Sequence, residues 1–207
     1  MVLKACLLEA GYSEEIRHTV DIDANWYSDT PPSDEQMTAS LQKALTENGI
    51  ELKVQNYRPY GEGRSAGFEL IDKDTDEVLF SMDIDVNRPV PPTKIYEIAG
   101  FRFRGVAPTQ MLADKIYVLS TNKIFRRIKD LVDIYYISKV FELNKADIMQ
   151  TLKNSGRTLE DFKEFLNNKD DLEHAYDKFR FTGDALKPPF DKIYCTVKTY
   201  IKDVLPK

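Results

Sequence analysis

Two segments in the first half of the chain alternate between apolar and polar side chains, and each carries an Asp-x-Asp triplet. Residues 17–24 read RHTVDIDA and residues 80–86 read FSMDIDV. Because successive side chains of a β-strand point to opposite faces, this spacing predicts two strands with one apolar and one acidic face. The predicted apolar faces consist of Val20, Ile22 and Ala24 in the first strand and of Phe80, Met82, Ile84 and Val86 in the second. We therefore expect a sheet whose carboxylates lie opposite the core.

The rest of the first half predicts a mixture of strands and helix, whereas the second half is helical. Ser33 and Gln36 form a capping box for a helix that ends at Asn48-Gly49. Further strands are predicted at residues 50–57, 66–72 and 95–104, and helices at residues 108–120, 124–141, 145–153, 159–166, 170–179 and 189–204. We expect an α/β (α+β) fold in two domains, an α/β core at residues 1–105 and a helical domain at residues 106–207.

The composition excludes several classes of protein. Of the 207 residues, 42% are hydrophobic and 30% charged, which is typical of a globular protein rather than a disordered or fibrous one. No apolar run approaches the ~20 residues of a membrane span, and the N-terminus lacks the features of a signal peptide. Cys6 and Cys195 do not have the spacing of a disulfide framework or a zinc cluster. We therefore expect a cytoplasmic protein with no membrane partner.

Charge is unevenly distributed along the chain. Residues 1–86 contain seven Lys and Arg against 18 Asp and Glu, whereas residues 87–207 contain 22 against 16. This asymmetry predicts an acidic surface that can hold cations and a basic surface that can meet a polyanion. The alternative interpretation is that acidic turns happen to cluster early in the chain.

The two Asp-x-Asp triplets are candidate metal ligands. Asp21 and Asp23 share one face of their predicted strand, and Asp83 and Asp85 share one face of theirs. Carboxylates so close together repel each other unless a cation lies between them. Mg²⁺ is commonly bound by one or two carboxylates together with substrate phosphates, and three carboxylates can hold two metal ions for phosphoryl or nucleotidyl transfer. A solvated outer face of the sheet is the alternative.

The helical half contains one lysine and two aspartates in apolar surroundings. Lys115 falls on the apolar stripe of its predicted helix, where an amine needs an anion or water as a partner. Asp130 and Asp133 lie three residues apart on one face of the next helix. The alternatives are a snorkelling lysine and an ordinary charged helix, in which Arg126 pairs with Asp130 at helical i,i+4 spacing.

Taken in order, these segments resemble the AbiEii/AbiGii family of nucleotidyltransferase toxins. RHTVDID resembles the family's first motif, an Arg and a Ser or Thr leading into an Asp-x-Asp strand, and FSMDIDV resembles its later acidic strand. QMLADKIYVL and RRIKDLVDIYYI resemble the third and fourth motifs, a helical lysine followed by an Arg-rich turn and a D-x-x-D helix. The resemblance spans Val2 to Ser138, and its last two motifs are the more specific.

The resemblance implies a nucleotidyltransferase-like mixed sheet with an appended C-terminal helical bundle that completes the active-site cleft. It also implies transfer of a nucleotide from an NTP to an acceptor, which in known members can be tRNA, with Mg²⁺ as cofactor. A cognate antitoxin protein is the implied partner, and abortive infection, a form of phage defence, is the implied role.

The resemblance also assigns roles to individual residues. The implied metal ligands are Asp21, Asp23 and Asp83, with Asp85 as the rival of Asp83. The implied nucleotide-binding residues are Arg17, Thr19 and Arg126. The implied catalytic residues are Asp21, Asp23, Lys115, Asp130 and Asp133. Lys115 would neutralise the charge that develops on the triphosphate, and Asp130 or Asp133 would orient the lysine or activate the acceptor hydroxyl.

Two departures from the family pattern leave two alternatives open. The family's first motif normally follows a glycine pair, whose bare backbone lets phosphates approach, and here the corresponding residues are Lys4, Ala5 and Cys6. The family's usual N-terminal helical segment is also missing. The first alternative is a catalytically impaired relative that binds a nucleotide, RNA or a partner protein. The second is a nucleic-acid-binding domain that uses the basic half.

Overall fold

The computed structural model describes residues 2–3, 21–26, 32–47, 49–60, 65–86, 91–98, 101–180 and 187–206. Of these, residues 2–3, 21–22, 98 and 101–103 are described by their backbone alone. These residues fall into two compact units. The first unit contains the strands from β1 to β5 and helix α2, and the second contains the helices from α3 to α8. Parts of β6 and β7 group with each unit.

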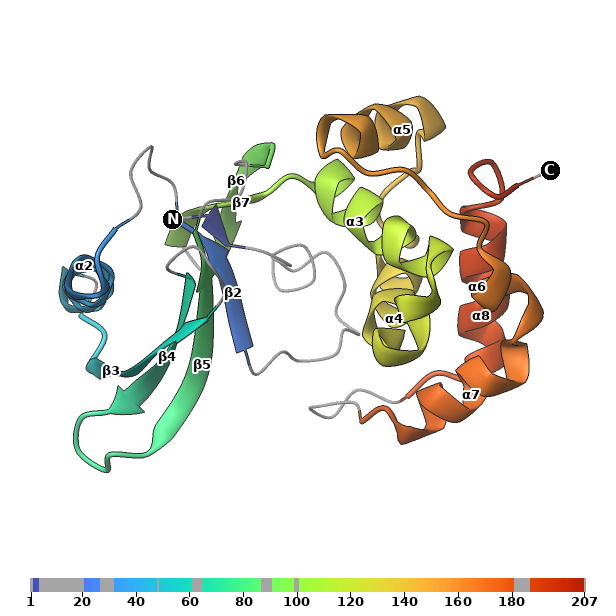
Figure 1. The fold of residues 1–207 in the computed structure, drawn as a ribbon. Helices are drawn as coiled ribbons and strands as arrows, with labels where there is room; N and C mark the ends of the chain where they lie inside the picture. The colour runs from blue at the N-terminus through green and yellow to red at the C-terminus, as the bar shows by residue number, and fades with distance from the viewer. Residues whose placement is uncertain are drawn as a thin grey trace. The chain divides into compact units, whose positions relative to one another are not determined.

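The described strands form one mixed sheet in the order β3-β4-β5-β2-β1-β7-β6 (Figure 1). Their bounds are β1 Val2–Leu3, β2 Asp21–Asn25, β3 Leu52–Tyr60, β4 Ser65–Asp72, β5 Val78–Asp85, β6 Thr93–Ile98 and β7 Phe101–Val106. β4 runs antiparallel to both of its neighbours, β3 and β5, whereas β2 pairs in parallel with β5. The sequence predicted a single strand at residues 95–104, and the structure has β6 and β7 there instead.

Among the side chains that the structure describes, the alternating strands bury the predicted face with one exception; Val20 and Ile22 lie outside this set. Ala24, Met82 and Ile84 belong to a core cluster on one side of the sheet. Phe80 was predicted to join them, but it is 43% exposed. That prediction is wrong because the start of β5 lies next to the exposed turn after β4, where residues 73–80 are all exposed and the core cluster no longer covers the strand.

Helix α2 (Asp34–Glu47) covers the core face of the first unit. The predicted capping box is confirmed, because the Gln36 backbone N–H donates to Ser33 Oγ at 3.2 Å and the Ser33 N–H donates to Gln36 Oε1 at 2.9 Å. Gly49, at φ 67°, ends the helix in the left-handed conformation that favours glycine. Met37 and Leu41 are the buried residues of the helix.

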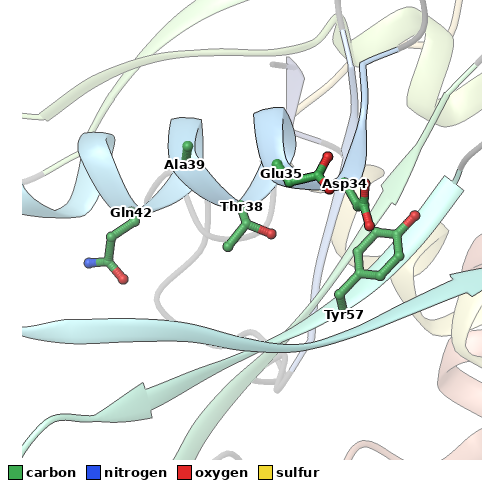
Figure 2. Close-up of a pocket in the computed structure, with 6 residues that line it drawn as sticks. All are labelled: Asp34, Glu35, Thr38, Ala39, Gln42 and Tyr57. Carbon is green, nitrogen blue, oxygen red and sulfur yellow. The ribbon is translucent and has the colours of Figure 1, made fainter.

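Between α2 and β3 lies an open depression (Figure 2). Its lining residues are Asp34, Glu35, Thr38, Ala39, Gln42 and Tyr57. Gln42 uses its amide for structure, since Nε2 donates to the Leu52 carbonyl at 2.9 Å and Oε1 accepts from the Val54 N–H at 3.1 Å. The depression therefore lies on the helix-covered side of the sheet, where the side chains hold α2 to the edge strand.

Strand β3 contains a bulge that changes which side chains face the core. Gln55 pairs with Glu69 and Arg58 pairs with Gly67, so β3 has one residue more than β4 between these pairs. Asn56 takes the left-handed conformation, with φ 55°. Val54 is buried in the core cluster, and Tyr57, three residues later, also packs against it. An undistorted strand would instead have turned Tyr57 away from the core.

The second unit is built from α3 Pro108–Ser120, η1 Asn122–Arg126, α4 Ile128–Ile137, α5 Lys145–Asn154, α6 Lys163–Asn167, α7 Lys169–Lys178 and α8 Phe190–Tyr200. α3 packs against α4, α5 and α6, and α4 packs against α7 and α8. Its interior side chains include Leu112, Ile116, Leu119, Leu131, Ile134, Phe165, Leu172 and Ile193. None of the helices in the described part of the chain is long and apolar enough to cross a membrane.

Three predicted helices differ from the structure, one of them only in its end, since the helix predicted at residues 189–204 stops at Tyr200. The helix predicted at residues 124–141 is divided into the 3-10 turn η1 and the helix α4, which ends at Ile137. Thr121 starts the 3-10 turn, because its hydroxyl accepts from the Lys123 backbone N–H at 3.2 Å. The helix predicted at residues 159–166 begins at Lys163 instead, and Phe162 before it has φ 56°.

Candidate functional site

A row of residues across four neighbouring strands holds two of the predicted carboxylates. Asp23 on β2 pairs with Asp83 on β5, Asp83 pairs with Gly67 on β4, and Gly67 pairs with Arg58 on β3. Paired residues of adjacent strands point to the same face of a sheet. Ala24 and Ile84, the next pair along, are buried in the core. The four residues therefore form one row, which we call the carboxylate row, on the face opposite α2.

Gly67 is the residue that leaves room in the carboxylate row. A Cβ atom at this position would lie 2.9 Å from Asp83 Oδ1, closer than real Cβ atoms approach an oxygen. The same point is 3.7 Å from Arg58 Nε and 3.8 Å from its Nη2. The Asp83 carboxylate and the Arg58 guanidinium consequently both lie over the glycine, where a side chain would otherwise stand.

The next row along the strands contains Asp85, Asn25 and Tyr60. Asn25 on β2 pairs with Asp85 on β5, and the Tyr60 hydroxyl on β3 donates to Asp85 Oδ1 at 3.3 Å. Burial raises the pKa of Tyr60 well above its ordinary value, and the negative charges of Asp85, Asp83 and Asp23 raise it further. Tyr60 therefore remains a neutral hydrogen-bond donor at physiological pH.

Asn25 is 7% exposed, and its buried Oδ1 has no hydrogen-bond partner among the described residues. A buried oxygen without a partner costs about 1–3 kcal/mol unless a ligand or water satisfies it. It lies on the face that carries Asp23 and Asp83. This oxygen marks the face as one prepared for additional polar partners.

The donors of these two rows fit a hard divalent cation. Mg²⁺ prefers carboxylate oxygens and usually keeps positions for substrate phosphates. Among the side chains that the structure describes, no three His, Cys, Asp or Glu residues form a metal-holding group. Asp85 therefore does not join Asp23 and Asp83 in one three-carboxylate group. The side chain of Asp21, whose backbone pairs with Ser81 in β5, falls outside the described set.

In the helical unit, Lys115 is enclosed by the two aspartates that the sequence singled out. Its Nζ donates to Asp133 Oδ2 at 2.6 Å and to Asp130 Oδ1 at 3.0 Å. The lysine side chain is 12% exposed and each aspartate side chain 1%. Arg127 adds a second cation, because its Nε donates to Asp130 Oδ2 at 2.9 Å. We call Lys115, Asp130, Asp133 and Arg127 the lysine cage.

Two opposing effects set the pKa of Lys115. Burial disfavours the charged amine and lowers the pKa. The charges of Asp133 and Asp130, and the hydrogen bonds to them, raise it, and the balance lies above the ordinary value. Lys115 is therefore an ammonium ion at neutral pH, held in one orientation by two buried carboxylates.

The remaining predicted site residues are Arg17, Thr19 and Arg126. Arg17 and Thr19 lie outside the described residues. Arg126 is exposed on η1, and the ion pair to Asp130 comes from Arg127 at i,i+3 spacing rather than from Arg126 at i,i+4. The reason is the break between η1 and α4 at Arg127, which changes the helical phase on which the predicted pair depended.

Five residues of these clusters, among them Asn25, were missed in the sequence. Arg127 has a local signal, the i,i+3 spacing to Asp130. Arg58 and Tyr60 have none, because only the bulge in β3 and its pairing with β4 bring them to the carboxylate face. Gly67 becomes meaningful only once Asp83 is known to lie beside it.

Comparison with known proteins supports a single family. A family model described as nucleotidyl transferase AbiEii toxin of type IV toxin–antitoxin systems matches residues 5–195. The solved structure of MenT4, a nucleotidyltransferase toxin from Mycobacterium tuberculosis H37Rv, has 16% sequence identity and a TM-score of 0.57, and the match covers 96% of this chain and 73% of that one. This similarity confirms the predicted fold class. No curated protein sequence matches.

Proposed function

Because the chain belongs to the AbiEii family of nucleotidyltransferase toxins from type IV toxin–antitoxin systems, we propose that it transfers a nucleotide from an NTP to an RNA acceptor such as tRNA. The chain is a nucleotidyltransferase by family, and the acceptor is our proposal. The observation that carries the proposal is the pairing of Asp23 with Asp83 on parallel strands, which brings carboxylates 60 residues apart in the chain into one row.

The transfer forms one bond and breaks one. A hydroxyl oxygen of the acceptor bonds to the α-phosphorus of the NTP, and the bond from that phosphorus to the bridging oxygen of the β-phosphate breaks. Pyrophosphate leaves with the electron pair, and the hydroxyl proton is released. This chemistry depends mainly on positioning and on neutralising negative charge, so it needs carboxylates for a cation and basic groups for phosphates.

We propose that Asp21, Asp23 and Asp83 hold Mg²⁺. When bound, the ion supplies charge neutralisation at the phosphates and polarises the attacked phosphorus. Asp85 is assigned another task, because it accepts the Tyr60 hydrogen bond and forms no three-carboxylate group with Asp23 and Asp83. The Asn25 oxygen, which has no partner among the described residues, lies on the same face of the sheet.

For the helical unit, we propose that Lys115 neutralises charge on the phosphates and that Asp130 and Asp133 orient it. The sequence left open whether the aspartates orient the lysine or activate the acceptor hydroxyl. Their almost complete burial and their hydrogen bonds to Nζ favour orientation. Arg17, Thr19 and Arg126 remain proposed nucleotide-binding residues, and a cognate antitoxin and action in the cytoplasm, in phage defence, complete the proposal.

The test is transfer of label from NTPs to RNA. Purified protein with Mg²⁺ and each α-labelled NTP in turn is expected to label a tRNA pool, and Asp21→Ala or Lys115→Arg is expected to abolish labelling. Lys115→Arg retains the charge while changing the geometry that the two aspartates impose. Persistent labelling by Asp21→Ala would remove the proposed metal site. Absence of labelling with every NTP would favour the alternative of a binding module.

A further inference from the structure

The bulge in β3 decides which side chains of this edge strand face the carboxylates. Val54 and Tyr57 both pack against the core, and Tyr57 lies 5.6 Å from Phe68 between ring centroids. Beyond the bulge the alternation is therefore shifted by one residue, and Arg58 and Tyr60 point to the opposite face. Two contacts agree with this, since Tyr60 reaches Asp85 and Arg58 lies over Gly67.

Asn56 and Glu69 hold the bulge and the arginine together. Asn56 adopts the left-handed conformation at φ 55°, and its Nδ2 donates to Glu69 Oε2. Glu69 Oε1 lies 3.4 Å from Arg58 Nη1. An ion pair of an arginine that is 59% exposed is weak, so Glu69 orients the guanidinium without consuming its other donors. Nε and Nη2 remain on the side of Gly67.

We propose that Arg58 is a substrate-binding residue that holds the β- and γ-phosphates of the nucleotide, and the pyrophosphate they become, beside the Asp83 carboxylate. This inference rests on the proposed nucleotidyltransferase function. The guanidinium and the Asp83 carboxylate both lie over Gly67, and Asp23 pairs with Asp83 on the neighbouring strand. A phosphate group is the ligand whose chemistry suits both groups, because arginine binds its oxygens through paired N–H groups and a carboxylate-bound cation attracts the remaining charge.

The position of Arg58 also distinguishes it from Lys53, the other basic residue of β3. Lys53 lies on the same strand before the bulge, pairs with Ile71 in register, and forms an ion pair with Asp76 at 3.2 Å. Both side chains are substantially exposed, yet only Arg58 stands in the carboxylate row. Lys53 is therefore a matched control for any effect that depends on charge alone.

The test measures binding of inorganic pyrophosphate in the presence of Mg²⁺ by titration calorimetry, which needs no knowledge of the preferred base. Arg58→Ala is expected to weaken binding about tenfold or more, as for loss of charge-assisted hydrogen bonds. Arg58→Lys keeps the charge and loses the paired donors, so its affinity for pyrophosphate should lie between those of the unaltered chain and Arg58→Ala. Lys53→Ala should change binding less than about twofold, and thermal melting should show that all variants remain folded.

Gly67→Ala provides a second approach that leaves Arg58 in place. The added methyl group would stand 2.9 Å from Asp83 Oδ1. Because that oxygen is the end of an exposed side chain, it can move at little cost to folding, but the carboxylate is displaced from its place beside Arg58. Weakened pyrophosphate binding with nearly unchanged melting is the expected result, and unchanged binding would contradict a phosphate held beside Arg58 and Asp83.

Several outcomes would overturn the inference. Arg58→Ala could bind pyrophosphate as tightly as the unaltered chain, or Lys53→Ala could weaken binding as much as Arg58→Ala does. The unaltered chain could also fail to bind pyrophosphate. Each of these results would contradict the inference. Binding that depends on Arg58 in a protein that labels no RNA would leave the arginine site standing and remove the proposed function. Label transfer that is unchanged in Arg58→Ala would leave the proposed function standing and remove the arginine site.

Discussion

The carboxylate row and the lysine cage both gather charged side chains, but they do so in opposite surroundings. In the row, Asp83 is exposed and Asp23 half-buried on one face of a sheet, and Arg58 is 59% exposed. In the cage, Asp130 and Asp133 are each 1% exposed, and both accept from one ammonium group. Buried charge must be neutralised within the fold, whereas charge at the surface can be neutralised by a ligand.

The difference predicts how each cluster responds to mutation. A cage residue contributes to folding whether or not substrate is present, because its partner would otherwise be a buried, uncompensated charge. A carboxylate in the row contributes little to folding and much to ligand binding. The loss of stability on mutation therefore separates the two clusters, even if both are needed for activity.

Among the variants that test this comparison, Lys115→Met is expected to have the largest effect on stability. Removing the ammonium leaves two carboxylates buried without it, and the expected loss of unfolding free energy is about 3–5 kcal/mol. Chemical denaturation measures this loss. Because the pKa of Lys115 is raised, its stabilisation is fully present at neutral pH and is lost only as the pH rises through that raised value in strongly alkaline solution.

Two further variants test the reason for that loss. Lys123→Ala removes an exposed lysine of η1 and should change stability by no more than about 0.5 kcal/mol. Combining Lys115→Met with Asp130→Asn and Asp133→Asn removes all three charges and should recover part of the stability. If Lys115→Met were as stable as the unaltered chain, the cage would not be the buried charge cluster described above.

Asp83→Asn tests the carboxylate row. We expect label transfer to fall about 100-fold or more, since a metal ligand supplies several kcal/mol of charge stabilisation to the reaction. The unfolding free energy should change by less than about 1 kcal/mol, and the rise in melting temperature on adding Mg²⁺ should disappear. Asp76→Asn, an exposed aspartate in the turn before β5, is the matched control and should leave all three measurements unchanged.

The smallest predicted effect concerns the helix that covers the other face of the sheet. Ser33→Ala removes one partner of the capping box and should lower the unfolding free energy by about 1 kcal/mol. Pyrophosphate binding should not change, because the carboxylates lie on the opposite face. Ser40→Ala, an exposed serine within α2, should cost nothing, so an equal loss there would assign the effect to the helix interior.

Local patterns in the sequence predicted much of the local structure. Period-two alternation placed Met82 and Ile84 in the core and Asp83 on the other face, and the capping box located the start of α2. Helical spacing placed Asp130 and Asp133 on one face. These predictions hold because each depends on residues a few positions apart. Phe80 was wrong because its exposure depends on where the core cluster ends.

By itself, the sequence determined the alternating faces, the capped helix, the acidic and basic halves, and the motifs that resemble one family. Only the tertiary structure decided that Asp23 stands opposite Asp83, that Lys115 lies between Asp130 and Asp133, and that Arg58 faces the carboxylates. The physical reason is that strand register and helix packing join residues far apart in the chain. A single extra residue in β3 is enough to exchange the faces of every side chain that follows.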